Sequence, residues 1–269
     1  MNRDSILRSL RNLVIDMDGV LYRGDEAIAG TRELIDFLRQ QGIGFVLATN
    51  NATRTPQQFV DKLAGMAVQV HSQEVLTSSL ATASYLARSA PPGTEECADG
   101  MDGLRTALEE AGFCLVEDGA EFVVAGMDFA ICYDRLAQAS LQIRAGARFI
   151  GTNPDVTFPS ERGILPGAGS LLAFLEAASG VQPIIVGKPG TAMLEQALVR
   201  MGAQPATTAM LGDRLETDIL AGQRAGLHTI LVLSGVTDEV ILSGTEIQPD
   251  LVFNDVAHLY AAWKGVVRG

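Results

Sequence analysis

Residues 13–19 read Leu-Val-Ile-Asp-Met-Asp-Gly, a short apolar run that ends at two carboxylates. The run from Leu13 to Ile15 has no alternation of polar and apolar side chains, which is typical of a strand buried on both faces. A helical pattern follows at residues 31–41 and ends at Gly42. Alternation of strands and helices favours parallel strands joined by right-handed crossovers. The stretch therefore predicts an α/β fold with a doubly wound parallel sheet.

The same rhythm continues along the chain on both sides of a central region. Each further apolar run is short and rich in Val, Ile or Leu, and all but the run at 229–233 are followed by a helical pattern. We expect them to extend the same sheet. The predicted strands are 45–48, 184–186, 210–211, 229–233 and 251–253, and the predicted helices are one opening at 55–56, then 191–201, 217–224 and one starting at 255.

The central region has strands and helices of its own. A helical pattern at 80–88 leads into this region, and residues 81–180 contain helical patterns at 104–111 and 135–144 and strand patterns at 113–116, 122–125 and 148–151. About 100 residues suffice for a separate small domain. We therefore predict a core domain at 1–80 and 181–269 with an inserted α/β cap domain at 81–180. Residues 95–99, Glu-Glu-Cys-Ala-Asp, form a poor strand by composition and weaken the expected edge of the cap.

Composition narrows the range of partners. The 269 residues include 20 Lys plus Arg against 32 Asp plus Glu, a net charge of −12, which disfavours nucleic acid and anionic membranes. Three scattered cysteines and three isolated histidines offer neither a disulfide framework nor zinc-ligand spacing. With no apolar run of membrane-spanning length and no signal peptide, we expect a cytoplasmic protein.

Polar residues follow several of the predicted strands directly. Ligands of an open α/β sheet bind outside the carboxyl ends of its strands, so these side chains are expected to converge. A lone aspartate at such a place is usually a turn former, and a lone lysine is usually a solvated surface residue. Polar residues at four strand ends together favour a ligand-binding site over four separate structural roles. They supply Asp16 and Asp18, then Thr49 with Asn50 and Asn51, then Lys188, and then Asp213 with Asp218.

The carboxylates of this set predict a hard divalent cation. Asp16 and Asp18 are two residues apart, and two close carboxylates cannot both stay ionised cheaply unless a proton or a cation joins them. Oxygen ligands without His or Cys suit Mg²⁺, which usually serves a phosphate partner. Thr49 and Lys188 offer that phosphate a hydroxyl donor and a positive charge. One aspartate could then attack phosphorus while the other transfers protons.

Four motifs in this order resemble the haloacid dehalogenase superfamily. They are DMDGVLYRG (16–24), TNN (49–51), GKP (187–189) and GDRLETDI (212–219). GARFIGTNPD (146–155) and PGAGSLLAFLEAASG (166–180) extend the likeness to the subfamily with a large inserted cap, which includes phosphatases of the NagD and p-nitrophenyl phosphatase types. The resemblance covers essentially the whole chain and implies a cytoplasmic Mg²⁺-dependent phosphatase acting on small phosphorylated metabolites. It also admits a homodimer through the cap.

The resemblance implies a role for each matching residue. Asp16 is the nucleophile and a metal ligand, and Asp18 is the general acid and base and gives its backbone carbonyl to Mg²⁺. Asp213 binds the metal, and Asp218 supports it either directly or from behind the ligands. Phosphate binding falls to Thr49, Asn50 and Lys188, and substrate binding to Asn51 and the cap-loop residues Asn153 and Asp155.

Alternatives to a phosphatase stay open at this point. Asp218 could serve only as a helix cap. A phosphotransferase or a non-catalytic phosphometabolite-binding protein could share the same fold. A signalling receiver domain also combines acidic residues, Thr and Lys, but lacks an inserted cap. The natural phosphomonoester is not defined by the motifs: a nucleoside monophosphate, sugar phosphate, phosphoglycolate or pyridoxal phosphate all fit.

Overall fold

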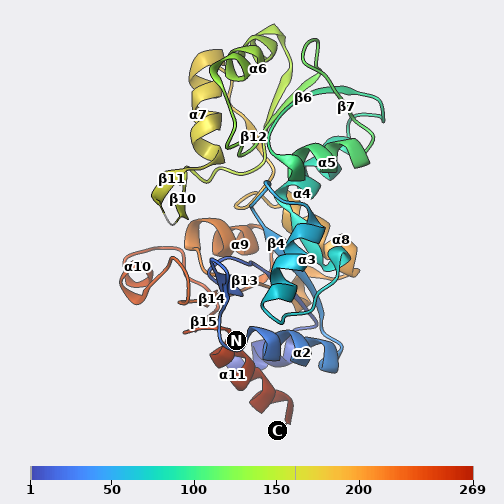
Figure 1. Cartoon of the computed structure of the whole chain (residues 1–269). Helices are drawn as coiled ribbons and strands as arrows, with labels where there is room; N and C mark the ends of the chain where they lie inside the picture. The colour runs from blue at the N-terminus through green and yellow to red at the C-terminus, as the bar shows by residue number, and fades with distance from the viewer. Residues whose placement is uncertain (1, 161, 269) are drawn as a thin grey trace. The chain divides into compact units, whose positions relative to one another are not determined.

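The computed structural model describes residues 2–160 and 162–268, which form two compact units. Unit 1 comprises residues 1–49, 57–76 and 193–269, and unit 2 comprises residues 50–56 and 77–192. Each unit is built on its own sheet with helices packed beside it (Figure 1). No helix in the described ranges is long and apolar enough to cross a bilayer.

Unit 1 is built around a six-stranded sheet with β1 (Asn12–Ile15) in its interior. The strand order is β15-β14-β13-β1-β4-β5, and β1 pairs in parallel with both of its neighbours. Sequence order and spatial order differ because the chain crosses over the sheet in both directions, as the doubly wound prediction requires. The other strands are β4 (Gly44–Thr49), β5 (Val75–Thr77), β13 (Thr208–Gly212), β14 (His228–Val232) and β15 (Leu251–Phe253).

Both faces of this sheet are covered. Leu13 and Ile15 belong to one large apolar cluster, whereas the intervening Val14 is just as fully buried outside it. On the clustered face, Phe37 of α2 packs edge-on against Tyr260 and Trp263 of α11. The predicted two-sided burial is therefore confirmed. The helices of unit 1 are α1 (Arg3–Ser9), α2 (Thr31–Gln41), α3 (Pro56–Gly65), α8 (Ala192–Met201), α9 (Leu220–Arg224), α10 (Glu239–Ser243) and α11 (Val256–Arg268).

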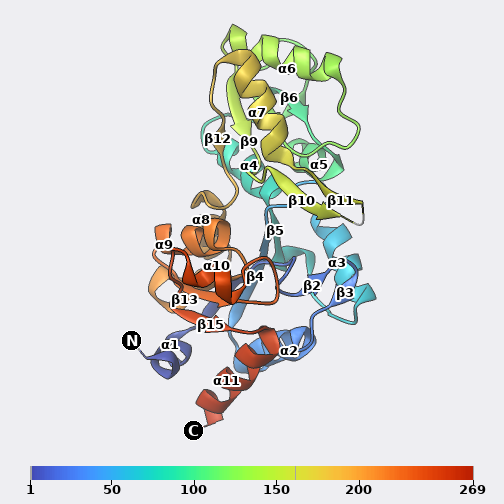
Figure 2. The same cartoon turned by 90° about the vertical axis from the view of Figure 1, so that its left-hand side faces the viewer.

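Unit 2 has a five-stranded, wholly parallel sheet of order β12-β9-β8-β6-β7. Figure 2 shows α6 and α7 beside the strands β12, β9 and β6 of this sheet. Its apolar centre joins alternate residues of the strands, such as Val123 and Phe149, to Ile143 of α6 and Leu175 of α7. The strands are β6 (Glu95–Asp99), β7 (Cys114–Leu115), β8 (Phe122–Ala125), β9 (Arg148–Gly151) and β12 (Ile184–Ile185), and the helices are α4 (Ser78–Ala87), α5 (Asp102–Glu110), α6 (Tyr133–Ala145) and α7 (Ala168–Ser179).

Short elements complete the two units. The chain also forms two antiparallel hairpins that are separate from the parallel sheets. One comes directly after the first acidic motif and the other before α7. Neither hairpin was predicted from the sequence. They are β2 (Tyr22–Arg23) with β3 (Glu26–Ala27), and β10 (Thr157–Ser160) with β11 (Gly163–Pro166); the single turns are η1 (Ser72–Glu74), η2 (Pro205–Thr207) and the π-helical turn η3 (Leu215–Ile219).

Two sequence predictions need correction. The strand expected at 184–186 is shorter and pairs with β9 in the sheet of unit 2, not with the sheet that contains β1. An Ile-rich run looks the same in either sheet, so the pattern could not assign it. Residues 95–99, judged a poor strand, form β6 between β8 and β7. Four residue pairs with β8 outweigh the weak strand preference of this segment. The domain boundaries at 80/81 and 180/181 stay a prediction.

Candidate active site

The first acidic motif continues directly from β1. The backbone N–H of Asp16 donates to the carbonyl of Leu211 at 2.8 Å, which extends the pairing of β1 with β13 by one residue. The chain then turns sharply, because the N–H of Gly19 donates to the carbonyl of Tyr22 at 2.8 Å and Gly19 has a φ of +81°. A left-handed conformation of this kind favours glycine. The turn holds Asp16 and Asp18 at the carboxyl end of the sheet.

Three carboxylates of unit 1 gather at this edge. Asp16, Asp213 and Asp218 each present one oxygen, and these atoms lie within 4.8 Å of one another. Asp213 follows β13 and Asp218 lies in η3, and both are almost completely buried. Like charges this close repel strongly unless a proton or cation lies between them. The cluster has the donor chemistry of a site for a hard divalent cation, and its use by Mg²⁺ stays a prediction.

Asp218 is held in place by the turn that carries it. Its Oδ2 accepts the backbone N–H of Arg214 at 3.1 Å, and its own N–H donates to the carbonyl of Arg214 at 3.1 Å. Gly212 makes room, since a Cβ at that position would overlap the side chain of Asp218. The residue therefore joins the carboxylate cluster and also stabilises the turn, so the two interpretations of Asp218 are compatible.

Asp18 lies in a different electrostatic setting. Burial of its carboxyl raises its pKa, although the positive charges of Lys62 and Arg214 and the N–H of Gly19 oppose the shift. A raised pKa favours the protonated form, which a general acid needs. Lys62 is positioned by the ring of Tyr22, 4.1 Å from its Nζ. Lys62 and Arg214 were not singled out in the sequence, because nothing in their spacing connects them to Asp18.

Thr49 and Asn50 stand where the chain leaves unit 1 for unit 2. Thr49 is the last residue of β4 and is buried. The side chain of Asn50 makes a two-way contact with the backbone of Lys188: Oδ1 accepts its N–H and Nδ2 donates to its carbonyl, both at 2.9 Å. Within unit 2, Asn50 thereby fixes the backbone of Lys188, whose side chain is only 1% exposed.

The remaining predicted residues build the loops of unit 2. Asn50 Nδ2 also donates to Asp155 Oδ2 at 3.2 Å, and the carbonyl of Asn50 accepts Asn153 Nδ2 at 2.8 Å. Asn153 Oδ1 in turn accepts the N–H of Asp155 at 3.1 Å. Asn51 Oδ1 closes its own turn by accepting the N–H of Thr53 at 2.9 Å. Asn50, Asn153, Asp155 and Lys188 are thus brought together, and the substrate-binding roles given to Asn51, Asn153 and Asp155 stay predictions.

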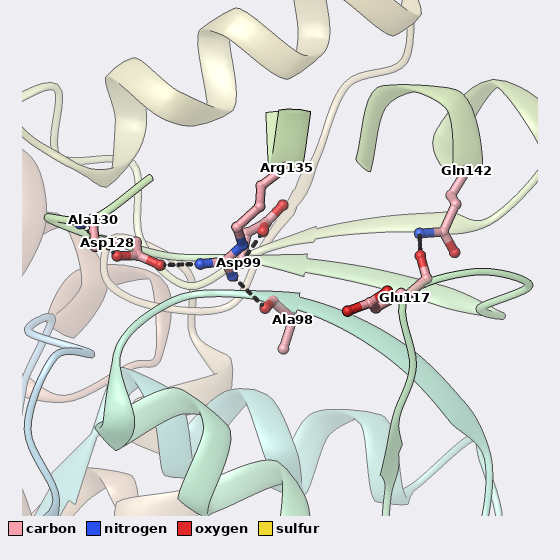
Figure 3. A network of polar contacts seen from close by, with 7 residues as sticks. All are labelled: Ala98, Asp99, Glu117, Asp128, Ala130, Arg135 and Gln142. Atoms are coloured by element: carbon pink, nitrogen blue, oxygen red, sulfur yellow. Dashed lines mark hydrogen bonds and ion pairs between the residues drawn. The ribbon is translucent and has the colours of Figure 1, made fainter. Parts of the chain in front are cut away.

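A second polar cluster occupies the carboxyl end of β6 in unit 2. Arg135 of α6 forms ion pairs with Asp99 Oδ1 at 3.0 Å and Asp128 Oδ2 at 2.7 Å, and donates to the carbonyl of Ala98 at 3.1 Å (Figure 3). The same figure shows Gln142 donating to the carbonyl of Glu117. Both aspartates are buried. Asp99, Asp128 and Arg135 share no local motif in the sequence, so this cluster was not predicted.

The chain matches two related family models. Residues 13–114 match the family described as haloacid dehalogenase-like hydrolase, and residues 185–259 match a HAD-hydrolase-like family. The chain is 41% identical over 231 residues to the 5'-nucleotidase YutF of Bacillus subtilis, covering 86% of this chain and 90% of that protein. It is 40% identical over 244 residues to the acid sugar phosphatase of Staphylococcus epidermidis, covering 90% and 94%.

Solved structures give the same picture. The 4-nitrophenylphosphatase of Thermotoga maritima superposes with a TM-score of 0.91 at 34% identity, covering 95% of this chain and 98% of that one. NagD of E. coli K-12 gives 0.87 at 36%, covering 92% and 97%. The glycerol phosphate phosphatase of Mycobacterium tuberculosis in complex with magnesium gives 0.89 at 31%, covering 96% and 79%.

Proposed function

Because the chain belongs to the haloacid dehalogenase-like hydrolases of the NagD-like subfamily and is a phosphoric monoester hydrolase, we propose that it cleaves small phosphomonoesters with Mg²⁺ through an aspartyl-phosphate on Asp16. Similarity to phosphatases supports the class of reaction. The covalent route and the metal go beyond that similarity.

One observation carries the proposal: the oxygens of Asp16, Asp213 and Asp218 within 4.8 Å of one another. The all-carboxylate donor set fits a hard cation better than zinc or copper. The magnesium in the structure of the Mycobacterium tuberculosis relative supports this choice. When bound, Mg²⁺ would offset the negative charge of the cluster and of the incoming phosphoryl group. Asp16, Asp213 and the backbone carbonyl of Asp18 would hold the ion, with Asp218 at or behind them.

The chain's own residues then divide the chemistry between them. A carboxylate oxygen of Asp16 attacks phosphorus as the bond from phosphorus to the ester oxygen breaks. Protonated Asp18 gives its proton to that leaving oxygen, which departs as an alcohol. In the second half, Asp18 takes a proton from water, and the resulting hydroxide attacks the phosphorus of the aspartyl-phosphate. Phosphate leaves, and Asp16 is restored as a carboxylate.

Other residues bind and orient the phosphoryl group. We assign its oxygens to the hydroxyl of Thr49, the backbone N–H of Asn50 and the ammonium group of Lys188. Hydroxyl, amide and ammonium donors suit an anion that carries two negative charges. Catalysis of phosphoryl transfer depends mainly on such positioning and charge stabilisation. The contacts that fix the backbone of Lys188 support this assignment.

The leaving group is proposed only as a class. The relatives named above are phosphatases of nucleotides, sugar phosphates, glycerol phosphate and 4-nitrophenyl phosphate. We propose a small phosphorylated metabolite of this range, with Asn51, Asn153 and Asp155 as candidates for contact with its organic part. Action in the cytoplasm and a homodimer through the cap stay predictions.

The test is phosphate release from 4-nitrophenyl phosphate and a panel of nucleotides, sugar phosphates, phosphoglycolate and pyridoxal phosphate. We expect release that needs Mg²⁺ and falls at least about a thousandfold in Asp16→Asn, because an amide is a poor nucleophile. Circular dichroism should show an unchanged fold. Full activity of Asp16→Asn would exclude the covalent route. Phosphoryl transfer to an added alcohol in place of water would identify a phosphotransferase, and no turnover of any compound would leave a binding protein.

A further inference from the structure

The loop that follows β14 lies directly against Asp213. A Cβ on Gly235 would overlap the carboxylate of Asp213, so only glycine fits there. Gly19, in the turn after Asp18, lies against both Asp213 and Gly235. A Cβ added to Gly19 would lie 2.6 Å from Asp213 Oδ2 and 3.0 Å from the Cα of Gly235. Real Cβ contacts are not this short. Two glycines from distant parts of the sequence thus enclose one predicted metal ligand.

Backbone hydrogen bonds fix Asp213 from the same loop. The N–H of Val236 donates to Asp213 Oδ2 at 2.7 Å, and the N–H of Thr237 donates to the carbonyl of Asp213 at 3.1 Å. A carboxylate held at one oxygen has its rotation restricted, which also fixes the direction of its other oxygen. The loop therefore determines how Asp213 faces the other carboxylates.

Ser234 ties this loop to the first acidic motif. It is 6% exposed, and its hydroxyl donates to the carbonyl of Gly19 at 2.7 Å. Its own carbonyl accepts Nε of Arg23 at 2.6 Å. Gly19 follows Asp18 directly, and Arg23 lies in the hairpin after it. Ser234 is thus hydrogen-bonded on both sides to the segment that carries Asp16 and Asp18.

We propose that Ser234 is a positioning residue that holds the Asp16–Asp18 segment against Asp213 and thereby sets the affinity of the site for a divalent cation. The three clustered carboxylates repel one another in the absence of a cation, so bonds from outside the cluster must keep them close. Removal of a group that hydrogen-bonds to a metal ligand typically lowers metal affinity ten- to a hundredfold. The proposed effect of Ser234 on metal binding stands by itself, and only its effect on turnover rests on the proposed function.

The experiment compares Ser234→Ala with the control variant Ser243→Ala. Ser243 is exposed, and its hydroxyl donates within its own helix turn, to the carbonyl of Val240. Mn²⁺ binding is measured by electron paramagnetic resonance without substrate, and Mg²⁺ is titrated into the 4-nitrophenyl phosphate assay. For Ser234→Ala, we expect the Kd for Mn²⁺ and the Mg²⁺ concentration for half-maximal rate each to rise about tenfold. The maximal rate at saturating Mg²⁺ should change less than about threefold. Ser234→Thr should restore metal affinity, and Ser243→Ala should match the wild type.

A second variant covers the case in which Ser234→Ala does not fold. Arg23 is exposed, so Arg23→Met removes its bond to Ser234 at little risk to folding, and we expect about a threefold rise in the Kd for Mn²⁺. Unchanged Mn²⁺ affinity in both variants, or a lower maximal rate with unchanged affinity, would overturn the proposal, as would a wild type that binds no Mn²⁺. If the wild type binds Mn²⁺ but hydrolyses no phosphoester, the proposed function fails, and weaker binding by Ser234→Ala still supports the role of Ser234.

Discussion

The two parallel sheets of this chain both carry buried aspartates at their carboxyl ends, but they deal with the charge differently. In unit 2, Arg135 lies between Asp99 and Asp128 and neutralises part of their charge. In unit 1, Asp16, Asp213 and Asp218 converge on one point. In unit 2 a cation of the chain itself lies between the carboxylates, whereas the cluster of unit 1 has the donor set of the Mg²⁺ site that we propose. Under the proposed function, the charge in unit 2 is structural and the charge in unit 1 is functional.

The pKa shifts in unit 2 follow the same logic. Burial raises the pKa of Asp99, and Arg135 opposes that shift. For Arg135 itself burial would lower the pKa, but the two aspartates outweigh it and raise the pKa. Arg135 thus favours the charged form of Asp99, and the two aspartates favour the charged form of Arg135.

Glu96 extends the comparison because it has no such compensation. It lies in β6 with an exposed fraction of 0%, and neither carboxylate oxygen has a hydrogen-bond partner among the described residues. Burial raises its pKa from 4.5 to about 8. The carboxyl is therefore protonated in the folded protein at neutral pH. Unit 2 thus contains both ways of burying a carboxyl group, one paired with a cation and the other neutral.

The largest expected effect concerns the pH dependence of unit 2. Between pH 4.5 and about 8, the unfolded chain has released the proton of Glu96 and the folded chain has kept it. The free energy of unfolding therefore falls as pH rises through this window and levels off above it, with a total change on the order of 5 kcal/mol. Glu96→Met, which cannot ionise, should remove this contribution and make unit 2 more stable at pH 8.

The neighbouring Cys97 offers a measurement of that effect. Its thiol is buried in β6, so it reacts with a thiol reagent only when unit 2 opens. In a background with the exposed Cys114 and Cys132 replaced by Ser, the labelling rate of the Glu96 protein should increasingly exceed that of Glu96→Met between pH 5 and pH 8. Using the ratio at each pH cancels the ionisation of the thiol. A ratio that stays constant with pH would contradict the assignment of a neutral, buried Glu96.

A smaller effect should follow from removing the cation of the compensated cluster. Arg135→Met leaves Asp99 and Asp128 buried without their partner, which should destabilise unit 2 by about 2 kcal/mol. This figure is below that for fully buried pairs because the Arg135 side chain is 36% exposed. Arg144→Met, on the exposed side of the same helix, is the matched control. Urea unfolding, monitored by the labelling of Cys97, should show a lower free energy of unfolding for Arg135→Met and no change for Arg144→Met. Equal stability of the two variants would contradict a structural role of the network.

The sequence was informative about unit 1 because its signals are local. Leu13–Ile15 is apolar without alternation, and Asp16 and Asp18 follow the strand directly, so both the sheet and the acidic edge could be predicted. Polar residues at the carboxyl end of a strand pointed to Asp16 and Asp18, and Ser234 also follows a strand, β14. It was not predicted as a site residue, because a serine and a glycine after a strand are common in loops. Its importance comes from a contact with Gly19, 215 residues away, that no local pattern contains.

Unit 2 was less predictable because its interactions override local preference. β6 contains Glu95, Glu96 and Asp99, which disfavour a strand, and is nevertheless held by its pairing with β8. Glu96 is tolerated once it takes up a proton, and Asp99 because a helix 36 residues away supplies Arg135. Neither compensation can be recognised before the fold is known.

The smallest expected effect tests the carboxylate cluster of unit 1 directly. A ligand that binds only the folded state stabilises it by RT ln(1 + [L]/Kd), so Mg²⁺ at about ten times its Kd should add about 1.4 kcal/mol to the free energy of unfolding of unit 1. Trp263, the single tryptophan, is buried in α11 of unit 1, so its fluorescence follows unit 1 during urea unfolding. Asp213→Asn should abolish the gain, because it removes a predicted ligand. Asp99→Asn should keep the gain, since Asp99 already has Arg135. A Mg²⁺ effect that survives in Asp213→Asn would mean that the three carboxylates are not the site, and the distinction between the two sheets would then be one of burial alone.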